Sequence, residues 1–214
     1  MRIEWLGHAC FLLETEGLKI ITDPYQPGSY GGAVGYSDIN VSADIVTVSH
    51  QHFDHNYIEP FSQAEVIDKE GVFKVKGIEI EGILTFHDEA RGSQRGKNLI
   101  FIFNLEGLKI AHLGDLGCIP QDLKKLENLD VVLIPVGGTF TLDAQLATRL
   151  IELINPKITI PMHFKTEKLG FDIEGVDKFI EGKPSVERLD VSSIEVKKEE
   201  LTFPGKIIVL KPSR

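Results

Sequence analysis

The chain has 214 residues, of which 42% are hydrophobic and 26% are charged, and its formal net charge is -9. This ordinary composition excludes a disordered, collagen-like or coiled-coil protein and favours a single globular domain over residues 1–214. The negative charge gives no general attraction for nucleic acid or anionic lipid, so we expect neither a nucleic acid nor a membrane as a partner.

The cysteine content and the termini favour a reducing compartment. Cys10 and Cys118 are the only cysteines, so the chain has no disulfide framework. The first residues include Glu4 and His8 and lack the basic start and long apolar run of a signal peptide. No apolar segment is long enough to span a bilayer. We therefore expect a soluble, cytoplasmic protein.

The first half of the sequence predicts strands, because short apolar runs alternate with turn signals such as Glu16-Gly17. The expected strands are residues 2–6, 10–14, 19–22, 44–49, 65–68, 72–75, 78–86, 99–104 and 109–113. Residues 23–40 are rich in Gly, Pro and Tyr and show no apolar period, which predicts a long loop. Such a loop is either a functional lid or binding loop, or a tolerated surface insertion.

The second half predicts an alternation of strands and helices. The expected strands are residues 130–135, 157–161, 193–196 and 206–210, and the expected helices are residues 120–126, 142–154 and 174–180. A strand-rich half followed by this alternation predicts an α/β (α+β) protein in which two sheets pack face to face, with helices outside. That arrangement is a four-layer sandwich.

The segment His50-Gln51-His52-Phe53-Asp54-His55 directly follows the strand expected at residues 44–49. In an extended strand end, His50 and His52 point the same way, whereas the adjacent Asp54 and His55 diverge. One pair can therefore hold one metal ion while the other pair reaches a second ion beside it. Imidazole and carboxylate groups suit zinc and other first-row divalent ions. The alternative is a polar loop with solvated histidines.

All seven histidines lie at expected strand ends or turns. They are His8, His50, His52, His55, His87, His112 and His163. Asp88 follows His87, and Gly114-Asp115 follow His112. Side chains placed after strands at one edge of packed sheets can converge although they are distant in sequence. The sequence therefore predicts a metal centre built from the whole chain.

This series resembles the metal-ligand series of the metallo-β-lactamase superfamily. The resemblance rests on the motif from His50 to His55, then on His87, Gly114-Asp115 and His163, and it covers most of the chain. The segments Trp5-Leu6-Gly7-His8, Ile21-Thr22-Asp23-Pro24, His112-Leu113-Gly114-Asp115 and Ile160-Pro161-Met162-His163 are similar to one branch of that superfamily. This branch contains predicted Zn-dependent hydrolases, relatives of ascorbate-6-phosphate lactonase, and N-acyl-phosphatidylethanolamine phospholipase D.

The resemblance implies an αββα sandwich with a site for two divalent ions, zinc in the first place, with Mn²⁺ or Fe²⁺ as alternatives. It implies that one ion is bound by His50, His52 and His87, the other by Asp54, His55 and His163, and that Asp115 bridges the two. It also implies that Asp23 braces the motif loop. His112 matches no ligand position in this series and is expected to support the site. It is the alternative ligand if His87 does not bind the metal.

The predicted activity is hydrolysis of an ester, lactone or phosphodiester bond by a hydroxide that bridges two metals. Asp54 and Asp115 are the expected catalytic carboxylates. Residues 88–98 are polar, basic and Gly-containing and begin beside a proposed ligand, which predicts a small anionic substrate. The candidate substrate contacts are His8, Arg91, Arg95, Asn98 and Lys165.

Three other functions remain open on the sequence alone. A mononuclear iron protein related to sulfur dioxygenases would carry out oxidation with a similar ligand set. A nuclease of the same superfamily is a second alternative, although the acidic chain and the short interval between Asp115 and His163 argue against it. A non-catalytic metal-binding protein is a third. The sequence does not define an oligomeric state.

Overall fold

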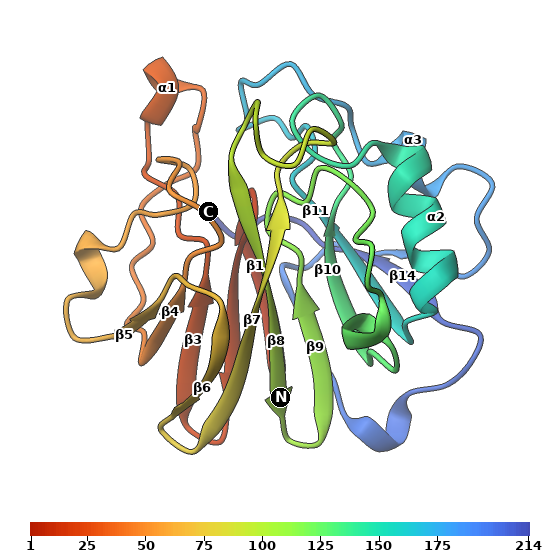
Figure 1. The fold of residues 1–214 in the computed structure, drawn as a ribbon, viewed down its shortest axis with the longest axis horizontal. Coiled ribbons are helices and arrows are strands. Elements are labelled where there is room, and N and C mark those ends of the chain that lie inside the picture. Colours follow the sequence, from red (N-terminus) through yellow and green to blue (C-terminus); the bar gives the residue numbers. More distant parts are fainter.

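Two mixed β-sheets pack face to face in the computed structural model, which describes residues 1–214 (Figure 1). The smaller sheet has the strand order β13-β1-β2-β3-β4-β5. Its strands are β1 (Arg2–Gly7), β2 (Cys10–Thr15), β3 (Leu18–Thr22), β4 (Ile45–Thr47), β5 (Glu65–Ile67) and β13 (Ser193–Glu195). The first three strands pair antiparallel, whereas β3, β4 and β5 run parallel to one another.

The larger sheet has the strand order β12-β14-β11-β10-β9-β8-β7-β6. Its strands are β6 (Gly71–Val75), β7 (Ile78–Phe86), β8 (Lys97–Leu105), β9 (Leu108–His112), β10 (Val131–Pro135), β11 (Ile158–Met162), β12 (Val186–Arg188) and β14 (Lys206–Val209). The strands from β6 to β9 pair antiparallel, and those from β9 to β12 pair in parallel. Parallel strands end at the same edge, and this places the loops after them side by side.

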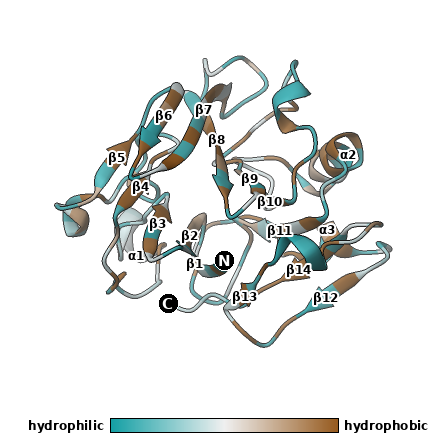
Figure 2. Ribbon diagram, turned by 90° about the horizontal axis from the view of Figure 1, so that it is seen from below, coloured by the Kyte–Doolittle hydropathy of each residue, from teal (hydrophilic) through white to brown (hydrophobic).

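The core between the sheets follows from the alternation of side chains along each strand. Ile3 and Trp5 of β1 and Phe11 and Leu13 of β2 belong to one cluster of 44 buried residues, which also includes most apolar residues of the larger sheet. Figure 2 shows the hydrophobic strands of the two sheets in this layered arrangement. The neighbouring residues of β1 and β2, such as Leu12, point to the opposite face and form a separate cluster.

Helix α2 (Ala144–Ile154) covers the outer face of the larger sheet (Figure 1). Asp143 caps its first turn by accepting the backbone N–H of Leu146 at 2.8 Å. The buried face of the helix presents Leu150 and Ile154 to the core. The expectation of a helix over residues 142–154 is therefore correct to within the capping residues. The short helix α3 (Asp177–Ile180) lies next to α2.

Loops, not long helices, cover the outer face of the smaller sheet. Tyr25, Val34 and Tyr36 come from the segment 23–40 and are buried against Leu12 and Ile21 in a cluster of 13 residues. The expectation of a long loop holds for this segment, which contains only the four-residue helix α1 (Ser29–Gly32). The segment is therefore part of the fold, because it shields one face of the sheet from water. It is not a dispensable insertion.

Some sequence expectations differ from the structure in extent. Residues 120–126 were expected to be helical, but only the 3-10 helix Lys124–Leu126 forms, because the side chain of Asp122 accepts the N–H of Lys124 and favours a turn. The helix expected at residues 174–180 is limited to α3. The short, polar strand β12 gives no apolar pattern and was missed. No helix is both long enough and apolar enough to cross a membrane.

Candidate metal centre

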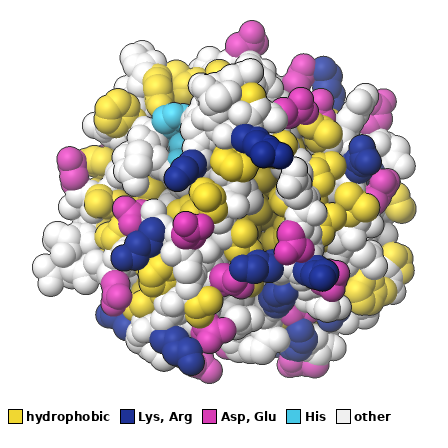
Figure 3. All heavy atoms as spheres, in the orientation of Figure 1, with side chains coloured by type: hydrophobic (Ala, Val, Ile, Leu, Met, Phe, Trp, Pro, Cys, Tyr) yellow, Lys and Arg dark blue, Asp and Glu magenta, His cyan; other side chains and the backbone are white.

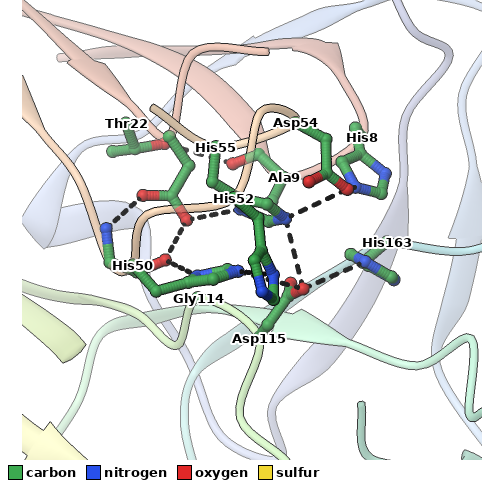
Figure 4. A network of polar contacts seen from close by, with 12 residues as sticks. His8, Ala9, Thr22, His50, His52, Asp54, His55, Gly114, Asp115 and His163 are labelled. Carbon is green, nitrogen blue, oxygen red and sulfur yellow. Dashed lines mark hydrogen bonds and ion pairs between the residues drawn. The ribbon is translucent and has the colours of Figure 1, made fainter. Parts of the chain in front are cut away.

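The proposed ligands come from loops that follow strands of both sheets. Figure 4 shows the side chains of His55, Asp115 and His163 close together in this cluster. The His50–His55 motif follows β4 of the smaller sheet, whereas His87, Asp115 and His163 follow β7, β9 and β11 of the larger sheet. His8 lies in the turn between β1 and β2. The structure thus brings together six of the seven histidines that the sequence places at strand ends or turns, all except His112.

Asp115 lies at the middle of this cluster. Its Oδ2 atom is 3.2 Å from the Nε2 atoms of both His55 and His87. It is 3.3 Å from Nε2 of His163 and 3.7 Å from Nε2 of His50. One carboxylate oxygen therefore faces four imidazole nitrogens from both sheets.

His50, His52 and His87 form the first group of donors, with ligand atoms that all lie within 4.8 Å of one another. Nε2 of His50 is 2.9 Å from Nδ1 of His52. The Nδ1 atom of His50 is turned away toward the hydroxyl of Ser49, at 2.9 Å. His112 is absent from this group, so the structure places His87 and not its rival in the ligand position.

His8, Asp54, His55 and His163 form the second group, again within 4.8 Å. Of these four residues, His8 was expected to face the substrate, but its side chain is fully buried. Its Nε2 atom donates to Oδ2 of Asp54 at 3.0 Å, which places the imidazole behind the carboxylate. In this position His8 supports a proposed ligand, and its contact with a substrate stays a prediction.

Several buried polar atoms in the cluster have no hydrogen-bond partner. They include Nε2 of His55, Oδ1 of Asp54 and Oδ1 of Asp115. A buried polar atom without a partner costs roughly 1–3 kcal/mol, so a group of them at one point requires a ligand. Imidazole nitrogens and carboxylate oxygens are donors for divalent cations, and the residues therefore fit the metal ions that the sequence predicts.

Asp23 holds the loop that carries the motif from His50 to His55 through contacts with Ser49 and His55. Its Oδ1 accepts the backbone N–H of Ser49 at 2.7 Å, and its Oδ2 accepts the Ser49 hydroxyl at 2.5 Å. Oδ2 also lies 3.0 Å from Nδ1 of His55. Burial alone would raise the pKa of Asp23, but His112 and His55 lower it, so the group is a carboxylate. Accepting the Nδ1 proton of His55 leaves Nε2 of that ring free for a metal ion.

Asn98 was expected to contact substrate, and the structure contradicts this. The side chain is fully buried, and its Oδ1 accepts the backbone N–H of Asp115 at 2.9 Å. Its Nδ2 donates to the Thr85 hydroxyl at 2.9 Å and to the Leu113 carbonyl at 3.0 Å. Because the amide is fully used within the protein, Asn98 positions Asp115 and has no group left for a substrate.

His112 contacts the same turn from the other side. Its Nε2 donates to the Ala9 carbonyl at 2.7 Å, and its Nδ1 accepts the N–H of Gly114 at 3.2 Å. Gly114 has φ 55, and a Cβ atom there would lie 2.4 Å from Oδ1 of Asn98. Only glycine fits this turn, which directs Asp115 into the cluster.

The pKa shifts in the cluster differ between residues. Burial alone would lower the pKa of His55, but Asp115 and Asp54 raise it well above its usual value. Burial and the neighbouring His55 hold the pKa of His50 well below its usual value, so this imidazole is neutral. Burial opposes ionisation of Asp54, but His55 and His8 lower its pKa below the usual range. Burial also opposes ionisation of Asp115, and His163 and His55 again lower the pKa. Neutral imidazole and ionised carboxylate are the forms that bind cations.

A cleft of about 490 Å³ opens beside His50 and His52. Three cationic residues line it, namely Arg95, Lys97 and Lys69, and none of them has a carboxylate oxygen within 4.0 Å. Lys69 lies far from the motifs in sequence and carried no signal of this role. Figure 3 shows histidine at the surface close to basic and hydrophobic side chains. Asp68 and Glu70 line the cleft as well, so its cationic residues outnumber its carboxylates by one.

The other basic candidates lie outside this cleft. The side chain of Arg91 is exposed and makes no hydrogen bond or ion pair. Lys165 is exposed and donates to the backbone carbonyl of Phe171 at 2.6 Å, so it supports a loop. The loop that carries Arg95 is shaped by Asp88, which accepts the N–H groups of Gly92, Gln94 and Arg95. Arg95 is thus the sequence-predicted cation that lines the cleft together with His50 and His52.

Comparison with known proteins agrees with the fold. Residues 2–163 match the family model of the β-lactamase superfamily domain. The chain is 34% identical to a UPF0173 protein of Pyrococcus furiosus, covering 78% of this chain and 84% of the relative. It is 31% identical to a UPF0173 metal-dependent hydrolase of Carboxydothermus hydrogenoformans, covering 78% and 85%.

A solved structure is similar over nearly the whole length. It is a Thermotoga maritima protein assigned to the Zn-dependent hydrolases of the metallo-β-lactamase superfamily, with 39% identity and a TM-score of 0.78. The alignment covers 98% of this chain and 97% of that protein. The fold class expected from the sequence is thereby confirmed. The chain belongs to the metallo-β-lactamase superfamily and, within it, to the UPF0173 family.

Proposed function

We propose that this protein is a hydrolase that holds two divalent ions, in the first place zinc, between its two sheets. His50, His52 and His87 would hold one ion, and Asp54, His55 and His163 the other, with Asp115 between them. The observation that carries the proposal is the position of Asp115 Oδ2, which faces imidazoles of both groups. Two such ions would lower the pKa of a shared water to about 7 and so provide hydroxide at neutral pH.

The residues of the chain supply orientation and proton transfer. Asp54 is an ionised carboxylate whose Oδ2 is held by His8, so its Oδ1 remains available to accept a proton during bond cleavage. Asp115 is oriented by Asn98 and carries negative charge between the two groups. Arg95 offers a guanidinium group that can pair with a carboxylate or phosphate of the substrate. We infer a small anionic substrate with an ester, lactone or phosphodiester bond.

The test begins with metal analysis of the purified protein, followed by turnover assays before and after chelation. We expect bound transition metal and turnover that is lost on chelation and restored by zinc. The double variant with His52→Ala and Asp54→Ala removes one donor from each group and is expected to lose both the metal and the activity. The matched control is Lys178→Ala, which removes only an exposed ion pair with Glu174.

The substrate panel includes an aryl ester, an anionic lactone and a phosphodiester. The narrower likeness to ascorbate-6-phosphate lactonase and to N-acyl-phosphatidylethanolamine phospholipase D stays a prediction, and the last two substrates address it. A protein that carries no transition metal, or that shows no metal-dependent turnover on the panel, contradicts the proposal. Bound iron together with oxygen uptake would favour the dioxygenase alternative.

A further inference from the structure

Four aromatic side chains form a continuous row beside the metal centre. The ring centroids of Phe53 and Tyr30 are 6.3 Å apart, and those of Tyr30 and Phe171 are 5.5 Å apart. The row ends at Phe140, whose ring lies 6.0 Å from Phe171. We call Phe53, Tyr30, Phe171 and Phe140 the aromatic rim. Each ring comes from a different loop, and these loops leave both sheets.

Three of the four rings of the aromatic rim are exposed, and the fourth, Phe171, is half-buried. Phe53 is 63% exposed, Tyr30 49% and Phe140 37%, and the only other exposed large aromatic side chain is Phe203. Burying such rings releases about 25 cal/mol per Å² of apolar surface, so fold stability gives no reason to leave them in water. Apolar groups gathered at one place on a surface mark a binding site.

The aromatic rim is joined to the metal centre at two points. The ring of Phe171 is 5.8 Å from the imidazole of His8, which is bonded to Asp54. Phe53 lies between His52 and Asp54 in the motif loop. A group bound on these rings would therefore extend directly from a bond placed at the metal centre.

The outer end of the aromatic rim carries positive charge. The guanidinium of Arg95 lies 5.8 Å from the centroid of the Phe140 ring, which is the geometry of a cation–π contact. Arg95 also lines the cleft beside His50 and His52. One residue thus links the apolar row to the basic cleft, and the combined surface matches a molecule that has both an apolar and an anionic part.

We propose that the aromatic rim binds an apolar acyl or aryl group of the substrate, while Arg95 pairs with an anionic group on the same molecule. The substrate class is an amphiphilic anion whose hydrolysable bond lies next to the apolar group. This inference rests on the proposed hydrolase function and narrows its substrate. A small, fully polar anion would leave the rings exposed in the complex.

The experiment measures binding, which needs no turnover. The probes are acetate, butanoate, hexanoate and octanoate, titrated calorimetrically into the metal-loaded protein. Full burial of a methylene group gives about a fourfold gain in affinity, and contact on one side of a chain gives roughly twofold. We therefore expect Kd to fall about twofold for each added methylene, from butanoate onward.

Variants separate the apolar and charged parts of the surface. Phe53→Ala and Phe140→Ala are expected to flatten the dependence of Kd on chain length, with metal content measured for each. Phe203→Ala removes an equally exposed ring outside the aromatic rim and is expected to retain the dependence. Arg95→Ala is expected to weaken all four carboxylates by a similar factor and to leave the slope in place.

Three results overturn the inference. The first is an affinity that does not change with chain length, and the second is a chain-length dependence that persists in both Phe53→Ala and Phe140→Ala. The third is a rim covered by a second copy of the chain, detected as a dimer in sedimentation that Phe53→Ala dissociates. Failure of the hydrolase proposal looks different: the chain-length slope is present, but no member of the ester, lactone and phosphodiester panel is hydrolysed.

Discussion

The Nε2 atom of His8 lies 3.0 Å from Oδ2 of Asp54, although 46 positions separate the two residues in sequence. The contact joins the β1–β2 turn to the motif loop after β4. Burial and the neighbouring His163 lower the pKa of His8 to about 4, so the imidazole is neutral at pH 7 and donates its single N–H to the carboxylate. His8 thus fixes one oxygen of Asp54 and leaves the other to face the cluster.

Replacing His8 tests this positioning role. His8→Ala is expected to weaken metal binding at the second donor group by about 10- to 100-fold, the usual loss when a residue that orients a ligand is removed. His8→Gln keeps an N–H donor and is expected to recover part of the affinity. Metal titration monitored by calorimetry gives both numbers. Equal affinity in His8→Ala and the parent protein would show that the hydrogen bond is dispensable.

Asn98 distinguishes positioning from substrate binding. Asn98→Ala leaves the N–H of Asp115 and the carbonyl of Leu113 without their partner, so we expect a loss of about 1–3 kcal/mol in the free energy of unfolding. It should lower kcat because Asp115 is less well oriented, with little change in KM. Urea unfolding and steady-state kinetics measure the two effects. A raised KM with unchanged kcat would instead restore Asn98 as a substrate contact.

The residues that could be predicted from sequence are those whose side-chain type is unusual at that position in the chain. The cluster of His50, His52, Asp54 and His55 after an apolar strand indicates metal binding before any coordinates are known. The direction in which a side chain points could not be predicted from the sequence, because it depends on how distant strands pack. His8 and Asn98 have polar side chains near the motifs, and only the three-dimensional structure shows that both point into the protein.

The aromatic rim could not be predicted from the sequence either. Its members come from four loops with no shared pattern, and a single Phe or Tyr in sequence is far more often a core residue. Their proximity depends on how loops of two sheets meet at one edge. The packing of residues 23–40 on the outer face of the smaller sheet could not be predicted either. This segment has no apolar period, although its residues Tyr25 and Val34 are buried.

Arg95 and Arg91 form a natural pair of variants, because both lie on the same loop and only Arg95 lines the cleft. Arg95→Ala is expected to raise KM for an anionic substrate by roughly two- to fivefold, which corresponds to the loss of one exposed charge pair. Arg91→Ala should leave KM unchanged. Kinetics with an anionic substrate and its uncharged analogue provide the measurement. Equal effects of the two substitutions would indicate a general charge effect.

Removing the metal ions is expected to lower the melting temperature. A ligand present at 1,000 times its Kd stabilises the folded state by about 4 kcal/mol, which corresponds to on the order of 10 °C for a chain of this size. Calorimetric scans with zinc and with a chelator measure the shift. The double variant with His52→Ala and Asp54→Ala serves as the control and is expected to show no zinc-dependent change. A shift of equal size in that variant would place the stabilising ion elsewhere.

Asp130 provides a stability prediction far from the metal centre, at the opposite end of β10. Its carboxylate accepts the N–H of Lys109 at 2.9 Å, pairs with Lys157 at 3.0 Å and is also bound by Lys198. Burial alone would raise the pKa of Asp130, but these three partners lower it. Its ionised form therefore stabilises the fold above the unfolded value of about 3.9, and this contribution is lost as the pH falls through the lower folded value.

Asp130→Asn is expected to cost about 1–3 kcal/mol in the free energy of unfolding at pH 7, because it removes the charge from buried hydrogen bonds. The difference from the parent protein should shrink as the pH falls below 4, where the parent carboxyl becomes protonated as well. Urea unfolding at a series of pH values measures this. The control Asp177→Asn removes an exposed ion pair with Arg188 and is expected to change stability by less than about 0.5 kcal/mol at any pH. A pH-independent cost at Asp130 would mean that its packing matters and its charge does not.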